Sequence, residues 1–263
     1  MITQLETNSN VQPIHHHTPS RHEPNQIPYT VSLNYEPVIP KAGQPTLITI
    51  QINENQTEKR IKKFDLVHEK LMHVIIVSED LSYFSHIHPI FDDNEGKFTV
   101  FHQFPATGKY KIWVDFKPKN GNQTLVTFKL DNMIGNAYKP TYITKGRQFI
   151  KQVDKDHKVK LIIPKEIKSN KVINIEFVIL DQNSKPITNL TPLMGAGGHS
   201  VIINSNLKEF LHVHPNEEVS SSWKGGPAIT FSTVFPYPGL YKVWGQFQHQ
   251  NEVVTADFVL EVT

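Results

Sequence analysis

The sequence contains no cysteine in its 263 residues. This absence excludes disulfides, thiolate metal sites and cysteine nucleophiles, and it leaves the redox state of the compartment open. No apolar run approaches the roughly 20 residues that a membrane helix requires, so no membrane insertion is expected. The first residues form neither a basic segment nor an apolar one, so no signal peptide is visible. As written, the chain is expected in the cytoplasm, and a missing leader or an unconventional export route would make it extracytoplasmic.

Net charge is also small. The formal value of +2 at pH 7 gives no reason to expect a nucleic-acid partner. The most basic run, residues 59–63, follows Glu58 and precedes Asp65, as in a solvated loop. Ser-His-Asp arrangements, paired carboxylates and phosphate-binding loops are not recognisable either. A three-histidine zinc centre could hydrolyse a substrate in principle, but the sequence identifies no general base, so an enzyme is not expected.

The chain does contain a repeated histidine motif. The run Phe84-Ser85-His86-Ile87-His88-Pro89 returns as Phe210-Leu211-His212-Val213-His214-Pro215. A third histidine precedes each run by the same distance, because His73 lies 13 residues before His86 and His199 lies 13 residues before His212. A shared spacing of this kind indicates two copies of one domain.

The copies continue downstream of the histidines. Phe104-Pro105, Gly108, Tyr110, Trp113 and Phe116 return as Phe235-Pro236, Gly239, Tyr241, Trp244 and Phe247. The offset grows from 126 to 131 residues, so the second copy has about five extra residues between its motifs, as a surface loop tolerates. The expected organisation is a disordered histidine-containing tail at 1–27, a first repeat at 28–132, a linker at 133–156 and a second repeat at 157–263.

Short alternating or β-branched segments, separated by glycine or proline turns, predict strands. In the first repeat they are residues 29–33, 46–52, 71–78, 83–88, 97–104, 110–116 and 124–130; in the second they include 159–163, 172–180 and 253–262. About seven short strands in roughly 100 residues are typical of an immunoglobulin-like sandwich. The expected fold class is all-β, with two tandem immunoglobulin-like antiparallel β-sandwich domains. Tyr110 and Tyr241 resemble the tyrosine corner of such folds, and Trp113 and Trp244 are expected to fill the cores.

The strand pattern places three imidazoles together in each repeat. His86 and His88 share a strand face because side chains alternate. If Glu79 faces Ser82 across a tight hairpin, paired residue numbers add up to 161 and His73 lies opposite His88. The same argument, with a sum of 413, places His199 opposite His214 and diagonal to His212. A turn one residue longer or shorter would put the first histidine on the other face.

Three neutral imidazoles with an open coordination position suit Zn(II), Cu(II) or Ni(II), and the Irving-Williams order favours copper. The expected metal ligands are His73, His86, His88, His199, His212 and His214. Candidate additional ligands are Met72, His68 and Met194, with Met72 or Met194 favouring Cu(I); Glu79 and Asp115 are further candidates in the first repeat. His102 and His249 have no counterparts and are expected to be ordinary surface residues. A loose metal-collecting arm is one interpretation of His15, His16, His17 and His22 in the tail, and polar filler is the other.

The two frames, His73 to Tyr110 and His199 to Tyr241, resemble bacterial immunoglobulin-like domains of the YtkA-like and copper-resistance kind. The resemblance implies an association with heavy-metal transport or resistance, a metal transporter as a candidate partner, and work outside the membrane. From the residues, the leading interpretation is a non-enzymatic metal-binding protein, copper first and zinc second, for storage, buffering or delivery. The alternative is a tandem scaffold or adhesion module whose histidines are structural. The sequence does not determine the oligomeric state.

Overall fold

The computed structural model describes residues 28–146 and 148–263, and every regular element in these ranges is a β-strand. The first repeat has an outer sheet of order β1-β2-β6-β5 and an inner sheet of order β4-β3-β7-β8. The outer sheet contains β1 (Tyr29–Glu36), β2 (Pro45–Glu54), β5 (Ile90–Asp92) and β6 (Lys97–Gln103). The inner sheet contains β3 (Met72–Ser78), β4 (Phe84–Ile87), β7 (Tyr110–Phe116) and β8 (Thr124–Leu130).

The second repeat follows the same plan, with an outer sheet of order β14-β11-β10-β9 and an inner sheet of order β13-β12-β15-β16. The outer sheet contains β9 (Ile150–Gln152), β10 (His157–Ile162), β11 (Val172–Asp181) and β14 (Ala228–Val234). The inner sheet contains β12 (His199–Asn204), β13 (Phe210–Val213), β15 (Gly239–His249) and β16 (Glu252–Val262). No helix long and apolar enough to cross a membrane is found between residues 28 and 146 or between 148 and 263.

The strand orders confirm the tandem immunoglobulin-like sandwich. In each repeat one sheet pairs the first, second and fifth strands of the immunoglobulin order, and the other pairs the third, sixth and seventh with an added edge strand. Both tyrosine corners are present, since the Tyr110 hydroxyl donates to the Ala106 carbonyl at 2.8 Å and the Tyr241 hydroxyl donates to the Tyr237 carbonyl at 2.9 Å. The tail at 1–27 lies outside the described residues.

The repeats differ at both edges of the outer sheet. In the first repeat β5 follows the His-Pro motif and pairs with β6. The second repeat has a longer loop here, held to β14 by the bridge between Pro215 and Phe231, so the extra residues replace a short edge strand. At the opposite edge, the linker contributes β9, in which Ile150 pairs with Lys160 of β10.

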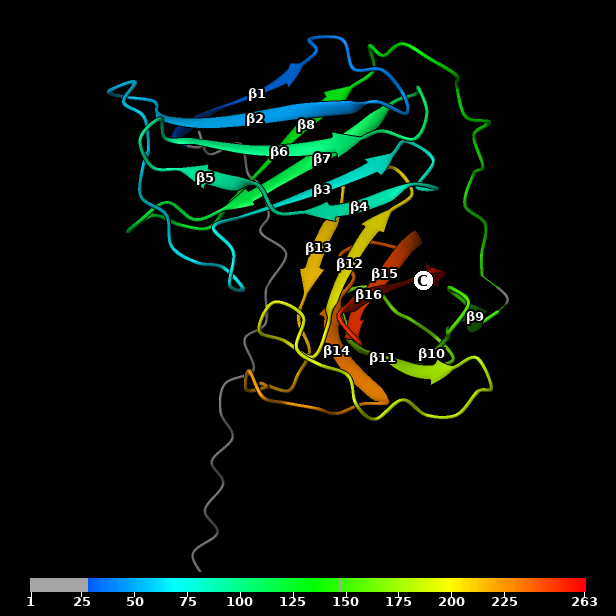
Figure 1. Ribbon diagram of the computed structural model, residues 1–263. Helices are drawn as coiled ribbons and strands as arrows, with labels where there is room; N and C mark the ends of the chain where they lie inside the picture. Colours follow the sequence, from blue (N-terminus) through cyan, green and yellow to red (C-terminus); the bar gives the residue numbers. More distant parts are fainter. Residues whose placement is uncertain (1–27, 147) are drawn as a thin grey trace, which may run out of the picture.

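Strand β3 is buried along its whole length, as its apolar sequence predicts. Val74 and Ile76 face the core of the first sandwich, whereas Ile75 and Val77 face the second repeat, where they meet Val201 of β12 and its neighbours. The two inner sheets therefore lie against each other, with β3 and β4 next to β12 and β13 (Figure 1).

The two tryptophans are buried, as expected of core residues, but their place in the fold differs from the expected one. Trp113 and Trp244 fill the contact between the repeats and not the sandwich cores. Trp113 stacks on Phe210 with ring centroids 5.4 Å apart, and Trp244 stacks on Phe84 at 4.7 Å. Because Phe84 and Phe210 are equivalent, as are the tryptophans, the two contacts are related by an approximate two-fold axis, which is the arrangement of an isologous interface.

The surface location expected for His102 and His249 is also wrong. Both side chains are buried. Nε2 of His102 lies 3.2 Å from the Tyr83 hydroxyl, and Nδ1 of His249 lies 2.8 Å from Nε2 of His157, whose Nδ1 contacts the Asp154 carboxylate at 2.9 Å. Tertiary packing encloses both rings. A single histidine in the sequence does not indicate such packing.

The buried His102 predicts a pH-dependent loss of stability. Burial lowers the pKa of His102 to about 4, whereas an imidazole in the unfolded chain has a pKa of about 6.5. Between these values the unfolded chain binds more protons, so the stability present above about pH 6.5 is lost as the pH falls toward 4. His102→Gln keeps a partner for the Tyr83 hydroxyl but does not titrate. From pH 7 to pH 5 we expect the variant to lose roughly 2 kcal/mol less unfolding free energy than the wild type, measured by chemical denaturation with a chelator present. Equal losses in both proteins would contradict the assignment.

Candidate metal centre

The hairpin register determines which way each histidine points. Val77 pairs with Phe84 and Val74 pairs with Ile87, so paired numbers add up to 161 as predicted. In the second repeat Ser200 pairs with Val213, which gives the predicted sum of 413. The first histidine of each triad therefore shares a face with the later two.

In the first triad three ring nitrogens converge. His73 Nδ1 lies 3.0 Å from His86 Nε2 and 3.1 Å from His88 Nε2, and the last two atoms are 3.2 Å apart. A tetrahedral ion with bonds of about 2.0–2.1 Å holds its ligand atoms about 3.3 Å apart. The three nitrogens thus form a nearly equilateral triangle of the size that one face of such a coordination sphere requires.

Hydrogen bonds on the far side of two rings assign their tautomers. His73 Nε2 must carry a proton, because it donates to the Val67 carbonyl at 2.8 Å. His86 Nδ1 donates to Oε1 of Gln246, in the other repeat, at 2.8 Å. In the neutral rings, His73 Nδ1 and His86 Nε2 then face each other with lone pairs. A contact of two acceptors at 3.0 Å is repulsive unless a cation lies between them.

Burial keeps the imidazoles of His73, His86, His88, His199 and His212 neutral. It lowers the pKa of His73, and together with repulsion from neighbouring imidazoles it lowers the pKa values of His86 and His88 to about 3. In the second triad burial lowers the pKa of His199 to about 3 and that of His212 well below the usual range. The neutral imidazole is the form that coordinates a metal.

The second triad repeats this geometry more loosely. Its ring centroids are separated by 5.7 Å for His199 and His212, 5.0 Å for His199 and His214, and 4.8 Å for His212 and His214. The equivalent distances in the first triad are 5.3, 4.9 and 4.6 Å. His199 Nε2 donates to the Leu193 carbonyl at 2.9 Å, as His73 does to Val67. Within the described residues, His199 Nδ1 and His212 Nε2 are buried and have no hydrogen-bond partner. Each triad could hold a metal ion, since its three ligand atoms lie within 4.8 Å of one another.

The two triads adjoin across the contact between the repeats. The ring of His212 lies 5.2 Å from that of His73 and 5.4 Å from that of His86. His68 of the first repeat stacks on His214 of the second, with centroids 3.3 Å apart. The sequence motifs predicted each triad but not that the triads would meet, because nothing local in either motif specifies the docking of the repeats.

The candidate additional ligands are placed differently from one another. Met72 is buried in the core of the first sandwich, on the strand face opposite to His73. Met194 lines a cavity of about 480 Å³ together with His86 and His88. Its counterpart in the first repeat is His68 and not Met72, since both precede their triads by the same distance and both have φ of 49°. Glu79 is exposed and pairs with Lys109, and Asp115 accepts hydrogen bonds from Gln123.

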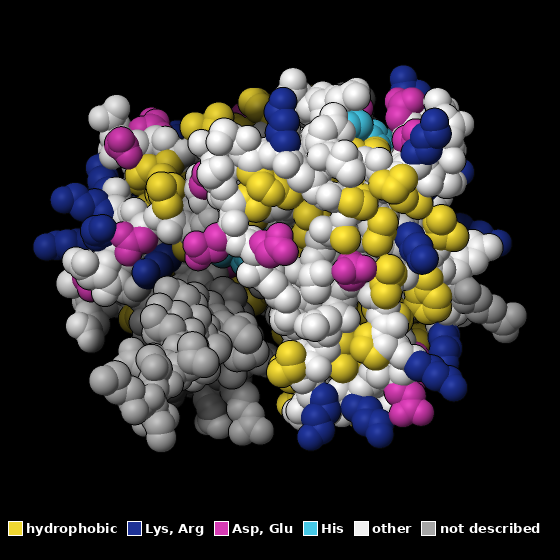
Figure 2. Space-filling model, turned by 90° about the horizontal axis from the view of Figure 1, so that it is seen from below, with side chains coloured by type: hydrophobic (Ala, Val, Ile, Leu, Met, Phe, Trp, Pro, Cys, Tyr) yellow, Lys and Arg dark blue, Asp and Glu magenta, His cyan; other side chains and the backbone are white. Residues whose placement is uncertain are grey.

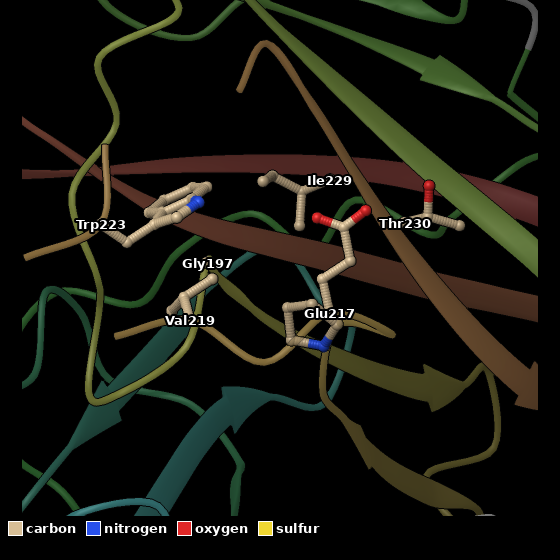
Figure 3. Close-up of a pocket in the computed structure, with 7 residues that line it drawn as sticks. Gly197, Glu217, Val219, Trp223, Ile229 and Thr230 are labelled. Carbon is tan, nitrogen blue, oxygen red and sulfur yellow. The ribbon is translucent and has the colours of Figure 1, made fainter. Parts of the chain in front are cut away.

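A second, much smaller pocket in the second repeat does not belong to the centre. It measures about 10 Å³, room for roughly one water, and Glu217 and Trp223 point into it beside Thr230 (Figure 3). None of its seven lining residues is a histidine. Only small areas of histidine reach the face seen in Figure 2, on which basic and acidic side chains are interspersed.

Comparison with solved structures gives distant matches. The adhesin FdeC of Escherichia coli aligns with a TM-score of 0.28 and 13% identity over 89% of this chain, which spans 64% of that structure. MtrC of Shewanella baltica aligns with a TM-score of 0.26 and 6% identity, over 90% of this chain and 70% of that one. The alpha-2-macroglobulin of E. coli gives a TM-score of 0.30 and 10% identity, over 89% of this chain and 14% of that one.

No curated protein matches the sequence. One family description does match, and it matches twice, at residues 25–133 and 151–263, which correspond to the two sandwiches. The chain therefore belongs to the family described as "Domain of unknown function (DUF8832)", of which it contains two copies.

Proposed function

We propose that this is a non-enzymatic metal-binding protein that holds one ion at each histidine triad, copper first and zinc second, for storage, buffering or delivery. The observation that carries the proposal is the contact of His73 Nδ1 with His86 Nε2 at 3.0 Å. With both rings neutral and both other nitrogens donating to oxygen, this contact joins two acceptors. A bound cation turns it from a repulsion into a coordination geometry.

The donor set supports the choice of metal. Imidazole nitrogen suits copper, zinc and nickel, whereas calcium and magnesium prefer oxygen. The Irving-Williams order places copper first among divalent ions at such a site. The resemblance of each frame to copper-resistance-type domains points the same way. The partners of His73 and His86, the Val67 carbonyl and the Gln246 amide, are of the kind that orients a metal-binding imidazole.

Removal of one triad tests the proposal directly. The background is the full chain with His15, His16, His17 and His22 replaced by Ser, so that the tail does not contribute ligands. We expect about two Cu(II) or Zn(II) ions per chain, and about one after His86→Ala/His88→Ala, because the remaining His73 supplies a single ligand to the first site. Titration calorimetry gives the stoichiometry, and nitrogen hyperfine coupling in the copper EPR spectrum identifies imidazole ligands.

The matched control is His102→Gln, which removes a buried histidine outside both triads and should leave two ions bound. No uptake above background by the parent protein would reject the proposal and favour the tandem scaffold or adhesion module.

Gln246 provides a second, subtler test. Its amide oxygen accepts the proton of His86 Nδ1 and so directs the lone pair of Nε2 toward the other two rings. Gln246→Leu removes the acceptor, and loss of such an orienting partner typically costs 10- to 100-fold in metal affinity. We expect this loss at the first triad only, measured by competition with a chromophoric chelator. Equal weakening of both sites, or of neither, would contradict the orienting role.

A further inference from the structure

A tight turn precedes each triad and carries the residue that distinguishes the two sites. Val67 and Lys70 exchange backbone hydrogen bonds of 2.8 and 3.1 Å around one turn, and Leu193 and Ala196 do so at 2.8 and 3.2 Å around the other. The carbonyls of Val67 and Leu193 also accept the protons of His73 and His199 (2.8 and 2.9 Å). Each turn is therefore part of the scaffold of its own triad.

The central residues of both turns have left-handed backbones. His68 and Glu69 have φ of 49° and 61°, and Met194 and Gly195 have φ of 49° and 73°. Two-residue turns of this kind favour Asn-Gly, because a left-handed backbone is costly for residues with larger side chains. Histidine tolerates this backbone better than most residues, whereas methionine does not suit it, so the presence of Met194 points to its side chain.

Each turn reaches into the other repeat. The His68 ring is stacked 3.3 Å from the His214 ring, at an angle of 24°. Met194 lines the cavity of about 480 Å³ that His86 and His88 open into. The turns meet between the triads, since a Cβ atom on Gly195 would lie 2.9 Å from the carboxyl carbon of Glu69. Position 68 thus belongs with the second triad and position 194 with the first.

The charge near the two triads differs as well. Lys70 lines the same cavity as His86 and His88, so its ammonium group lies on the side of the first triad. The residue at the equivalent position of the second turn is Ala196, which carries no charge. A nearby cation penalises a divalent ion more than a univalent one, because the Coulomb energy scales with the charge.

We propose that the two metal sites are unequal: the first triad, with the Met194 thioether as an added ligand, takes Cu(I), and the second triad, with the His68 ring stacked on its His214, takes Zn(II) or Cu(II). Soft thioether sulfur selects Cu(I), whereas imidazole suits the divalent ions. Each site then draws its distinguishing side chain from the opposite repeat. The inference rests on the proposed function, because it requires that both triads bind metal.

The test uses the full chain in the background that lacks tail histidines. Cu(I) affinity is measured under a reductant by competition with bicinchoninate, and Zn(II) affinity by competition with a colorimetric chelator. We expect Met194→Leu, which keeps the side-chain volume, to weaken Cu(I) binding at least 10-fold and to leave Zn(II) binding unchanged. His68→Asn, which tolerates the left-handed backbone, should weaken Zn(II) binding at least 10-fold and leave Cu(I) binding unchanged.

Met72→Leu is the matched control, since this methionine is buried in the first core and should affect neither ion. X-ray absorption of the Cu(I)-loaded protein should show a sulfur neighbour that disappears in Met194→Leu but not in Met72→Leu. Two ions bound with preferences that neither turn variant changes would overturn the inference and leave the proposed function standing. Absence of any binding by the parent protein would overturn both.

Discussion

The contact of the two inner sheets is the constraint on which the rest of the structure depends. It removes Ile75, Val77 and their counterparts in β12 from water, and the paired stacks of Phe84 on Trp244 and Phe210 on Trp113 hold it together. Apolar and aromatic burial of this kind is the main favourable term in association. The same contact covers the histidines, so that His73 and His199 are buried and the other four are half-buried. Ring nitrogens lose water, and the pKa values of His73, His86, His88, His199 and His212 fall. The polar groups that compensate are a few backbone carbonyls, one amide and the other imidazoles. A buried polar cluster costs free energy unless its members have partners. Nitrogens that converge in these apolar surroundings therefore need a partner for their lone pairs.

Within each repeat, the local hairpin does the positioning. A four-residue turn after Ser78 sets the register of β3 and β4, and the register puts His73 on the face of His86. The preceding turn supplies the carbonyl that fixes the His73 tautomer. These elements are close in sequence, so the triad forms wherever the hairpin forms. What the other repeat adds is the second layer of contacts, including the Gln246 amide on His86 and the His68 ring on His214.

The difference between local hairpin contacts and contacts with the other repeat explains what the sequence could predict. Local pattern and turn geometry predicted the strands, the immunoglobulin-like order, both tyrosine corners and the registers of the β3–β4 and β12–β13 hairpins. The short β5 was missed because Ile90–Asp92 has too few residues to show alternation. The roles of Trp113 and Trp244, the burial of His102 and His249, and the meeting of the triads depend on docking and packing between distant segments, which periodicity does not encode. The pairing of Met194 with His68 was available from the equal spacing before each triad. It was obscured because methionine also precedes His73 directly, at Met72, whose side chain the alternation sends into the core.

The approximate two-fold axis lies within one polypeptide, and this has an evolutionary consequence. Two separate copies of a single sandwich, associating through the same inner sheet, would be bound by symmetry to carry identical residues at every equivalent position. Joining the copies through residues 133–156 releases that restriction, because each half can then be altered by mutation without the other. The two turns that meet across the contact already differ, with histidine and glutamate in one half where the other has methionine and glycine. Covalent fusion has in this way made chemical divergence possible at a surface where a dimer of free subunits would have had to remain uniform.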